Sequence, residues 1–341
     1  MKIIRLGTYK TGFTYYKVRS KGNVEITDVG EIEKIKGLKI PPAYDNVTIL
    51  NNKKIIAFGY DSKNRKQILY HPAFIATQTT KKYNKISASI KIFSKLKKKI
   101  SEDLNSNDEK KVAIAVIITL ILTCGFRIGN KKYEKDNNSV GLTTLKYKHL
   151  LFQDDKLVID FIGKKGVRNV AECDNKRIYE YLYQKANAAN AVNAANATNA
   201  ANAANAYIFS YDGDKVIRSS DVNEYLRTIS SPYSIVITTK DLRTWNANML
   251  FLTYYKKLRK LRKKRSVVIA GNGADGADAM TDAAKATDAA KATNAAKATK
   301  ETEKDIKRAI EMVAEKLHNS YSICKKSYID PKIIEEVLHK N

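Results

Sequence analysis

The chain has 341 residues, 43% of them apolar, which is enough for about two domains with buried cores. Its 62 Lys and Arg residues against 35 Asp and Glu give a formal net charge of +27. A surplus of this size favours a nucleic acid partner, although a solubilising or ribosome-associated surface would also be basic. The three cysteines, Cys124, Cys173 and Cys324, lack zinc spacing and favour a reducing compartment, and the N-terminus lacks the apolar run of a signal peptide.

Short β-rich runs separated by Gly, Asn, Asp and Pro fill the beginning of the chain. These runs are IIRLG, FTYYKV, NVEIT, VTIL, KIIAFGY and KQILYHP. They predict a small N-terminal β domain over residues 1–75, with a hinge near residues 74–82.

Apolar residues at helical spacing follow the hinge. Helices are expected over residues 86–104 and 108–126, and the apolar run from Val112 to Cys124 is too short to span a bilayer. That run therefore predicts a buried helix, and we expect no membrane partner.

The rest of the chain is expected to form a larger, mainly helical domain over residues 76–341 with one β-hairpin. KLVIDFIG (156–163) and VRNVAEC (167–173) predict its two strands, joined by a turn at Lys164, Lys165 and Gly166. Further helices are predicted over the following segments: residues 176–186, 219–229, 239–260 and 302–316. The fold class is therefore α+β.

Two low-complexity segments interrupt this domain at about residues 186–206 and 270–300. The first repeats Asn at every third position among Ala, and the second repeats DAAKAT. Neither has the large apolar residues that a core requires, so we expect mobile surface loops or weakly helical spacers.

Several kinds of active site are excluded by the motifs. The chain has no phosphate-binding loop of the P-loop form and no Cys/His zinc cluster. Asp212 and Asp214 in YDGDK have the spacing of a magnesium site, but Asp and Gly are also turn formers, and a surface turn is the preferred interpretation.

The remaining candidates for catalytic residues are a set of cationic side chains and one tyrosine. Arg127 follows the buried helix, Lys164 lies at the hairpin tip, Arg243 lies in KDLRT, and Tyr328 lies in SYIDP. Taken singly, each has an ordinary structural explanation, such as a helix cap, a solvated turn, or an ion pair between Arg243 and Asp241.

In this order, the motifs resemble those of type IB DNA topoisomerases, especially the small poxvirus and bacterial enzymes. LKIPPAYDNVTI and AFGYDSKNRKQILYHPAF are similar to the β-domain signatures of that family, although Asn64 stands where the family usually has Gly. An αL conformation, which Asn tolerates, would preserve that turn. The resemblance covers nearly the whole chain apart from the two repeat segments.

By this resemblance, four catalytic positions are filled by Arg127, Lys164, Arg243 and Tyr328. The fifth position lies nine residues before the tyrosine, where poxvirus members have His and bacterial members have Asn. Asn319 occupies it here, and His318 is the alternative through a shift of one residue. Residues expected to contact DNA are Gln67, Tyr70, Lys132 and Tyr133.

The chemistry implied is transient cleavage of one DNA strand through a 3′-phosphotyrosyl link, followed by rejoining, without metal, ATP or another cofactor. The cations would favour the phenolate of Tyr328 and stabilise a phosphorane-like transition state. Lys164 would protonate the leaving 5′ oxygen. The resemblance also implies a monomer whose two domains form a clamp on double-stranded DNA.

Two alternatives remain at this point. A tyrosine recombinase shares this chemistry but usually has His where Lys240 lies in KDLRT. A non-catalytic basic DNA-binding protein would explain the charge but not the motif order. The richness in Lys, Asn, Ile and Tyr, taken with the resemblance, suggests a large DNA virus. The location would then be the virion and host cytoplasm, and otherwise an intracellular site with DNA.

Overall fold

The computed structural model describes residues 2–153, 156–195, 204–213, 215–271 and 288–339. The chain divides into two compact units, Met1–Lys85 and Ile86–Asn341. Helix α2 (Pro72–Ala88) crosses the division. The expected boundary after residue 75 falls inside this helix, because the helix begins directly after the last strand of the first unit.

The N-terminal unit is built on one antiparallel sheet of six strands in the order β3-β2-β1-β4-β5-β6. The strands are β1 (Ile3–Thr8), β2 (Gly12–Arg19), β3 (Gly22–Glu25), β4 (Asp45–Ile49), β5 (Ile55–Tyr60) and β6 (Lys66–Tyr70). Each corresponds to one of the six β-rich runs, so the prediction of a β-sheet here is confirmed.

One face of this sheet packs against helix α1 (Val29–Lys36), which the sequence patterns did not predict. Ile35 of α1 joins Ile3, Val47 and Ile49 in the buried core of the unit. At the turn between β5 and β6, Asn64 has φ 54°, so the expected αL conformation is confirmed.

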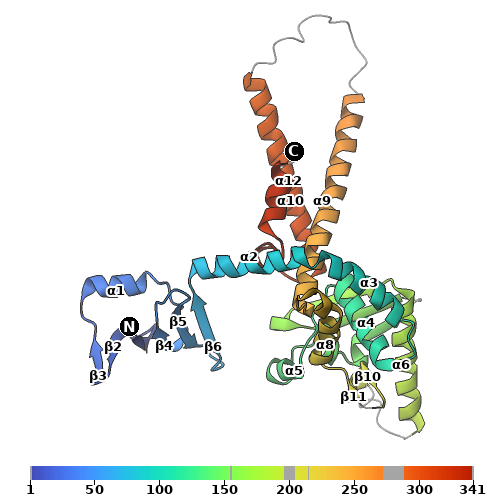
Figure 1. Cartoon of the computed structure of the whole chain (residues 1–341), viewed down its shortest axis with the longest axis horizontal. Helices are drawn as coiled ribbons and strands as arrows, with labels where there is room; N and C mark the ends of the chain where they lie inside the picture. The colour runs from blue at the N-terminus through green and yellow to red at the C-terminus, as the bar shows by residue number, and fades with distance from the viewer. Residues whose placement is uncertain (1, 154–155, 196–203, 214, 272–287, 340–341) are drawn as a thin grey trace, which may run out of the picture. The chain divides into compact units, whose positions relative to one another are not determined.

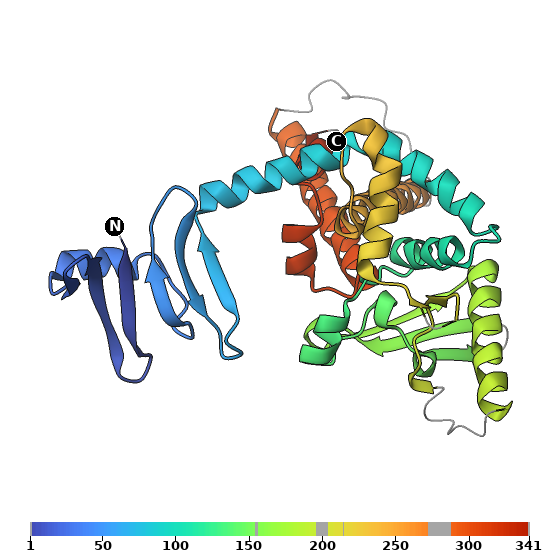
Figure 2. The same ribbon diagram turned by 60° about the horizontal axis from the view of Figure 1, so that its bottom comes forward.

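The second unit is mainly helical and also contains short strands (Figures 1 and 2). Its helices are α3 (Ile90–Asp103), α4 (Glu109–Thr123), α5 (Lys131–Asn137), α6 (Lys176–Ala195), α8 (Ser219–Ser230), α9 (Thr239–Gly271), α10 (Asp288–Lys316), α11 (Tyr321–Ser327) and α12 (Pro331–His339). Short 3₁₀ turns are η1 (Leu142–Thr144), η2 (Tyr147–His149), η3 (Lys164–Gly166) and η4 (Ser231–Tyr233).

The predicted hairpin is present and gains a third strand. β8 (Lys156–Ile162) pairs with β9 (Arg168–Cys173) through the turn η3, and β7 (Leu150–Gln153) pairs with the other edge of β8. Two very short strands, β10 (Ser210–Tyr211) and β11 (Lys215–Val216), form a separate hairpin. Asp212 and Gly213 lie in its turn, as the preferred interpretation of YDGDK required, and Asp214 lies outside the described residues.

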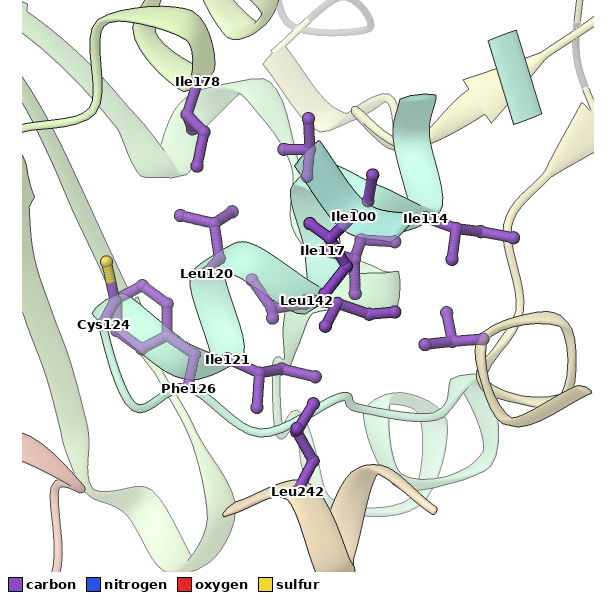
Figure 3. Packing of buried hydrophobic residues seen from close by; sticks show 14 of the residues in the cluster. Ile100, Ile114, Ile117, Leu120, Ile121, Cys124, Phe126, Leu142, Ile178 and Leu242 are labelled. Carbon is purple, nitrogen blue, oxygen red and sulfur yellow. The ribbon is translucent and has the colours of Figure 1, made fainter. Parts of the chain in front are cut away.

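Helix α4 forms the centre of the larger core. Its residues from Ala113 to Ile118 are all buried, as are Leu120 and Ile121, because the helix is apolar on every side and is covered by other elements. Figure 3 shows Ile117 and Leu120 of α4 among apolar side chains from distant parts of the chain, including Ile178 and Leu242. No helix in the described ranges combines the length and apolarity needed to cross a membrane.

A second core lies between α9, α10 and the C-terminal helices. α9 and α10 run side by side (Figure 1), and Phe251 of α9 and Ile310 of α10 are fully buried there. Both helices extend into the segment expected at 270–300, and α6 extends to Ala195 within the segment expected at 186–206. At the edges of both segments the helical alternative therefore holds, which agrees with their Ala content, while residues 196–203 and 272–287 lie outside the described residues.

Candidate active site

Arg127 is positioned by a tight loop that follows α4. Cys124 ends the helix, and the loop then passes through Gly125 and Gly129, which have φ of 68° and 79°. A Cβ at Gly129 would lie 2.8 Å from the Cα of Gly141, so a larger residue does not fit. From this loop, the half-buried Arg127 donates from Nη2 to Oδ1 of Asn319 at 2.6 Å.

Arg243 lies in the first part of α9 and is almost fully buried, with 4% of its surface exposed. It donates from Nη1 to the carbonyl oxygen of Gly125 and from Nη2 to that of Leu317 at 3.3 Å. These main-chain bonds, rather than an ion pair with Asp241, orient the guanidinium. Burial lowers the pKa of Arg243 to about 10, so the group stays charged at neutral pH.

Tyr328 follows α11, and its ring centroid lies 5.6 Å from the guanidinium carbon of Arg243. Burial by itself would raise the pKa of the Tyr328 phenol. The positive charges of Arg243 and Arg127, with polar contacts from Arg243 and Asn319, outweigh burial and hold that pKa below its ordinary value. The phenolate is therefore easier to form here than on a free tyrosine.

Asn248 fixes the backbone on both sides of Ile329, and the sequence reasoning missed it. Its Nδ2 donates to the carbonyl oxygen of Tyr328 at 2.9 Å, and its Oδ1 accepts from the N–H of Asp330 at 2.8 Å. Because Asn248 lies on the same helix as Arg243, α9 positions both the cation and the tyrosine. In the sequence, the one sign of this role is that Asn248 is a polar residue in a mostly apolar part of α9.

Asn319 and His318 point to different places although they are neighbours. His318 has φ 51°, stacks on Phe126 with ring centroids 5.3 Å apart, and its Nε2 lies 3.1 Å from the carbonyl oxygen of Cys124. Asn319 instead contacts Arg127 and lies near Tyr328.

Two buried donors of this cluster have no hydrogen-bond partner in the described part of the chain. They are Nε of Arg243 and Nδ2 of Asn319, whose polar contact with the Tyr328 hydroxyl falls outside hydrogen-bond geometry. Leaving a buried donor unpaired costs about 1–3 kcal/mol, so a site that keeps two such donors is suited to an acceptor-rich ligand such as a phosphate.

Lys164 is not joined to this cluster. It lies in η3 at the tip of the β8–β9 hairpin, where its side chain is exposed. Among the described residues it makes no hydrogen bond or ion pair. The hairpin tip is held by its own contacts, including a 2.8 Å bond from the N–H of Gly163 to the carbonyl oxygen of Val167.

The four residues expected to contact DNA lie in both units. In the first unit, Gln67 on β6 donates from Nε2 to Asp61 at 2.9 Å, and Tyr70 packs at a tilt against Phe74. In the second unit, Lys132 and Tyr133 are exposed on α5.

The basic run at residues 256–265 has mixed surroundings. Arg262 pairs with Asp305 of α10 at 3.4 Å, and Leu258 packs on the α9–α10 core, while Lys256, Lys257 and Lys260 are exposed. Arg262 and Leu258 of this run therefore connect α9 to α10, whereas its exposed lysines are accessible to solvent or to phosphates. Within the described ranges, no group of three or more potential metal ligands is found.

Comparisons with known proteins agree with this arrangement. A family model for the catalytic core of eukaryotic DNA topoisomerase I matches residues 64–340. The DNA topoisomerase 1B of Acanthamoeba polyphaga mimivirus is 26% identical over 285 residues, covering 77% of this chain and 76% of that protein. The chain belongs to the DNA topoisomerase I family.

Poxvirus proteins match over shorter lengths. The DNA topoisomerase 1 of rabbit fibroma virus is 26% identical over 186 residues, which cover 52% of this chain and 59% of that protein. The DNA topoisomerase I of monkeypox virus is 28% identical over 142 residues, or 40% of this chain and 45% of that protein. Together with the family match, these relatives identify a poxvirus-like enzyme of type IB that acts on DNA topology, and they favour neither a recombinase nor a non-catalytic protein.

Proposed function

We propose that this enzyme relaxes supercoiled DNA by cutting and rejoining one strand through Tyr328, without metal or nucleotide. The observation that carries the proposal is the gathering of Arg127, Arg243 and Asn319 around Tyr328, with the pKa of its phenol lowered. A tyrosine among positive charges is suited to attack a phosphodiester, because those charges also stabilise the transition state.

In the proposed reaction, the phenolate oxygen of Tyr328 attacks the phosphorus, and the bond from phosphorus to the 5′ oxygen breaks. Lys164 gives a proton to that leaving oxygen. The product is a 3′-phosphotyrosyl link and a free 5′ hydroxyl, which rejoins by the reverse steps after the strand has rotated. The energy of the phosphodiester bond is kept in the link, so rejoining needs no ATP.

The guanidinium groups of Arg127 and Arg243 would contact the non-bridging oxygens of the scissile phosphate. Nδ2 of Asn319, which lacks a partner within the described residues, would donate one more bond. The direction of the Asn319 side chain favours it over His318 for this role. The exposed position of Lys164 leaves it free to meet a bound duplex.

For binding, we propose that a monomer closes its two units on the duplex as a clamp. Gln67 and Tyr70 would contact DNA from the first unit, and Lys132 and Tyr133 from the second. The viral relatives further support a source among large DNA viruses, with the enzyme present in the virion and the host cytoplasm.

The proposal is tested with supercoiled plasmid in EDTA and without nucleotide. The wild-type enzyme should relax both signs of supercoiling and leave a covalent adduct when the reaction is stopped with detergent. Tyr328→Phe should bind DNA with nearly unchanged affinity, yet form no adduct and relax nothing. An adduct that persists in this variant would show that another residue is the nucleophile.

A further inference from the structure

Helix α5 presents Lys132 and Tyr133 and depends on contacts with its neighbours for its position, beginning with the cap from Asn130 to the N–H of Lys132. It spans only Lys131–Asn137 and buries no residue. Isolated helices shorter than about 12–15 residues are marginal in water, so α5 needs anchoring by the rest of the fold. Every residue of α5 is exposed except Glu134, which is half-buried.

Both carboxylate oxygens of Glu134 are engaged. The hydroxyl of Tyr207 donates to Oε2 at 2.7 Å, and Nζ of Lys146 lies 2.9 Å from Oε1. Lys131, also on α5, lies over the Tyr207 ring at 4.9 Å from its centroid. Burial and the bond to Glu134 raise the pKa of Tyr207 to about 12, so its hydroxyl remains a donor across the physiological range.

The partners of Glu134 are themselves fixed to the core. Lys146 and Tyr207 pair as an antiparallel bridge, and the N–H of Ile208 donates to the carbonyl oxygen of Leu145 at 3.1 Å. Ile208 and Leu145 are both fully buried. Glu134 therefore connects a short exposed helix to a rigid part of the second unit.

The negative charge of Glu134 needs a reason on a helix that is proposed to contact DNA. A carboxylate on a helix that meets DNA repels phosphates, and this cost needs to be offset. The ion pair with Lys146 neutralises that charge, and the bond from Tyr207 uses the side chain as an anchor.

We infer that Glu134 is a positioning residue that holds α5 in its DNA-binding orientation before the duplex arrives. This rests on the proposed contacts of Lys132 and Tyr133 with DNA. A pre-oriented helix loses less conformational entropy on binding, so Glu134 strengthens DNA binding without taking part in the reaction at Tyr328.

The test measures single-turnover cleavage of a duplex oligonucleotide at increasing enzyme concentration. It yields the half-saturating concentration and the maximal rate. Loss of a hydrogen bond to a charged group predicts that Glu134→Ala and Tyr207→Phe each raise half-saturation by about tenfold, with the maximal rate changed by less than about twofold. Glu134→Gln keeps an acceptor for Tyr207 and should lie between wild type and Glu134→Ala.

Asp136→Asn is the matched control, because it removes an equal charge from an exposed position on the same helix. It should leave half-saturation unchanged or lower it. The double variant Lys132→Ala/Tyr133→Ala should itself raise the half-saturating enzyme concentration. Adding Glu134→Ala to this variant should raise that concentration little further, because Glu134 acts through those two side chains.

The inference is overturned if Glu134→Ala matches Asp136→Asn, if its effect falls on the maximal rate alone, or if the Lys132→Ala/Tyr133→Ala variant binds like wild type. A wild-type enzyme that forms no covalent adduct would instead contradict the proposed function. Thermal unfolding of each variant separates loss of the anchor from general destabilisation, which would lower the unfolding midpoint.

Discussion

At the scale of single residues, the candidate site depends on which of two adjacent side chains faces Tyr328. The positive φ of His318 turns its ring toward Phe126 and the carbonyl of Cys124, while Asn319 contacts Arg127. The spacing of the motifs indicated both residues as candidates for the fifth catalytic position. It could not show which side chain faces Tyr328, because side-chain direction at and after a positive-φ residue depends on tertiary contacts.

This arrangement predicts unequal effects of two substitutions. Asn319→Ala should slow single-turnover cleavage by about 100-fold or more, the range for losing a donor to a developing negative charge. His318→Ala should slow it much less and mainly lower thermal stability, because it removes packing on Phe126. The reverse order of cleavage rates would assign the fifth position to His318.

The lowered pKa of Tyr328 also predicts a pH dependence. If the phenolate is the nucleophile, the cleavage rate rises with pH in proportion to the phenolate fraction, up to the pH at which the proton donor for the leaving oxygen becomes limiting. Arg127→Ala removes a charge that lowers the pKa of Tyr328, so the rising limb should shift to higher pH.

The pH–rate profile of single-turnover cleavage measures this shift. Lys325→Ala is the comparison, because Lys325 is an exposed cation on α11 whose charge is screened by water. Coincident rising limbs for Arg127→Ala and wild type would mean that Arg127 does not control ionisation of the tyrosine.

At the scale of elements, α4 connects the core to the site, because the loop that carries Arg127 begins where this helix ends. Its apolar run predicted a buried helix, and the prediction is confirmed. In contrast, α1, α5, α11 and α12 were missed, since helices this short depend on their neighbours rather than on their own pattern.

Leu120→Ala should therefore lower the free energy of unfolding of the second unit by about 2–5 kcal/mol, the range for deleting a buried leucine. Urea unfolding followed by the fluorescence of the single tryptophan, Trp245, measures this, because Trp245 stacks on Phe93 in the same core. Ile90→Ala, at a position that is 59% exposed, should change stability by less than about 0.5 kcal/mol. Equal losses in both variants would contradict the central place of α4.

At the scale of the whole molecule, the net charge of +27 governs how the enzyme meets DNA. Most contacts of the proposed clamp are expected to go to phosphates, so the logarithm of DNA affinity should fall linearly with the logarithm of salt concentration. The charge surplus alone indicated this partner, and the family assignment agrees with it.

Fluorescence anisotropy with a labelled duplex at several salt concentrations gives the slope. Lys132→Ala should make it shallower by about 0.9, the value for one lost phosphate contact. Lys176→Ala, at a highly exposed position on α6, should leave the slope unchanged. An unchanged slope for Lys132→Ala would remove Lys132 from the proposed phosphate contacts.

The sequence by itself determined the family, the β-strands of the first unit, the buried helix α4, and the identity of the candidate tyrosine and cations. These follow from local patterns, since alternation, apolar runs and motif order are written along the chain. Only the tertiary structure decided where the side chains of His318 and Asn319 point, that Asn248 fixes the backbone around Tyr328, and that Glu134 is anchored by Tyr207 and Lys146. Those contacts join residues far apart in the chain, and their formation depends on the packing of whole elements rather than on any local preference.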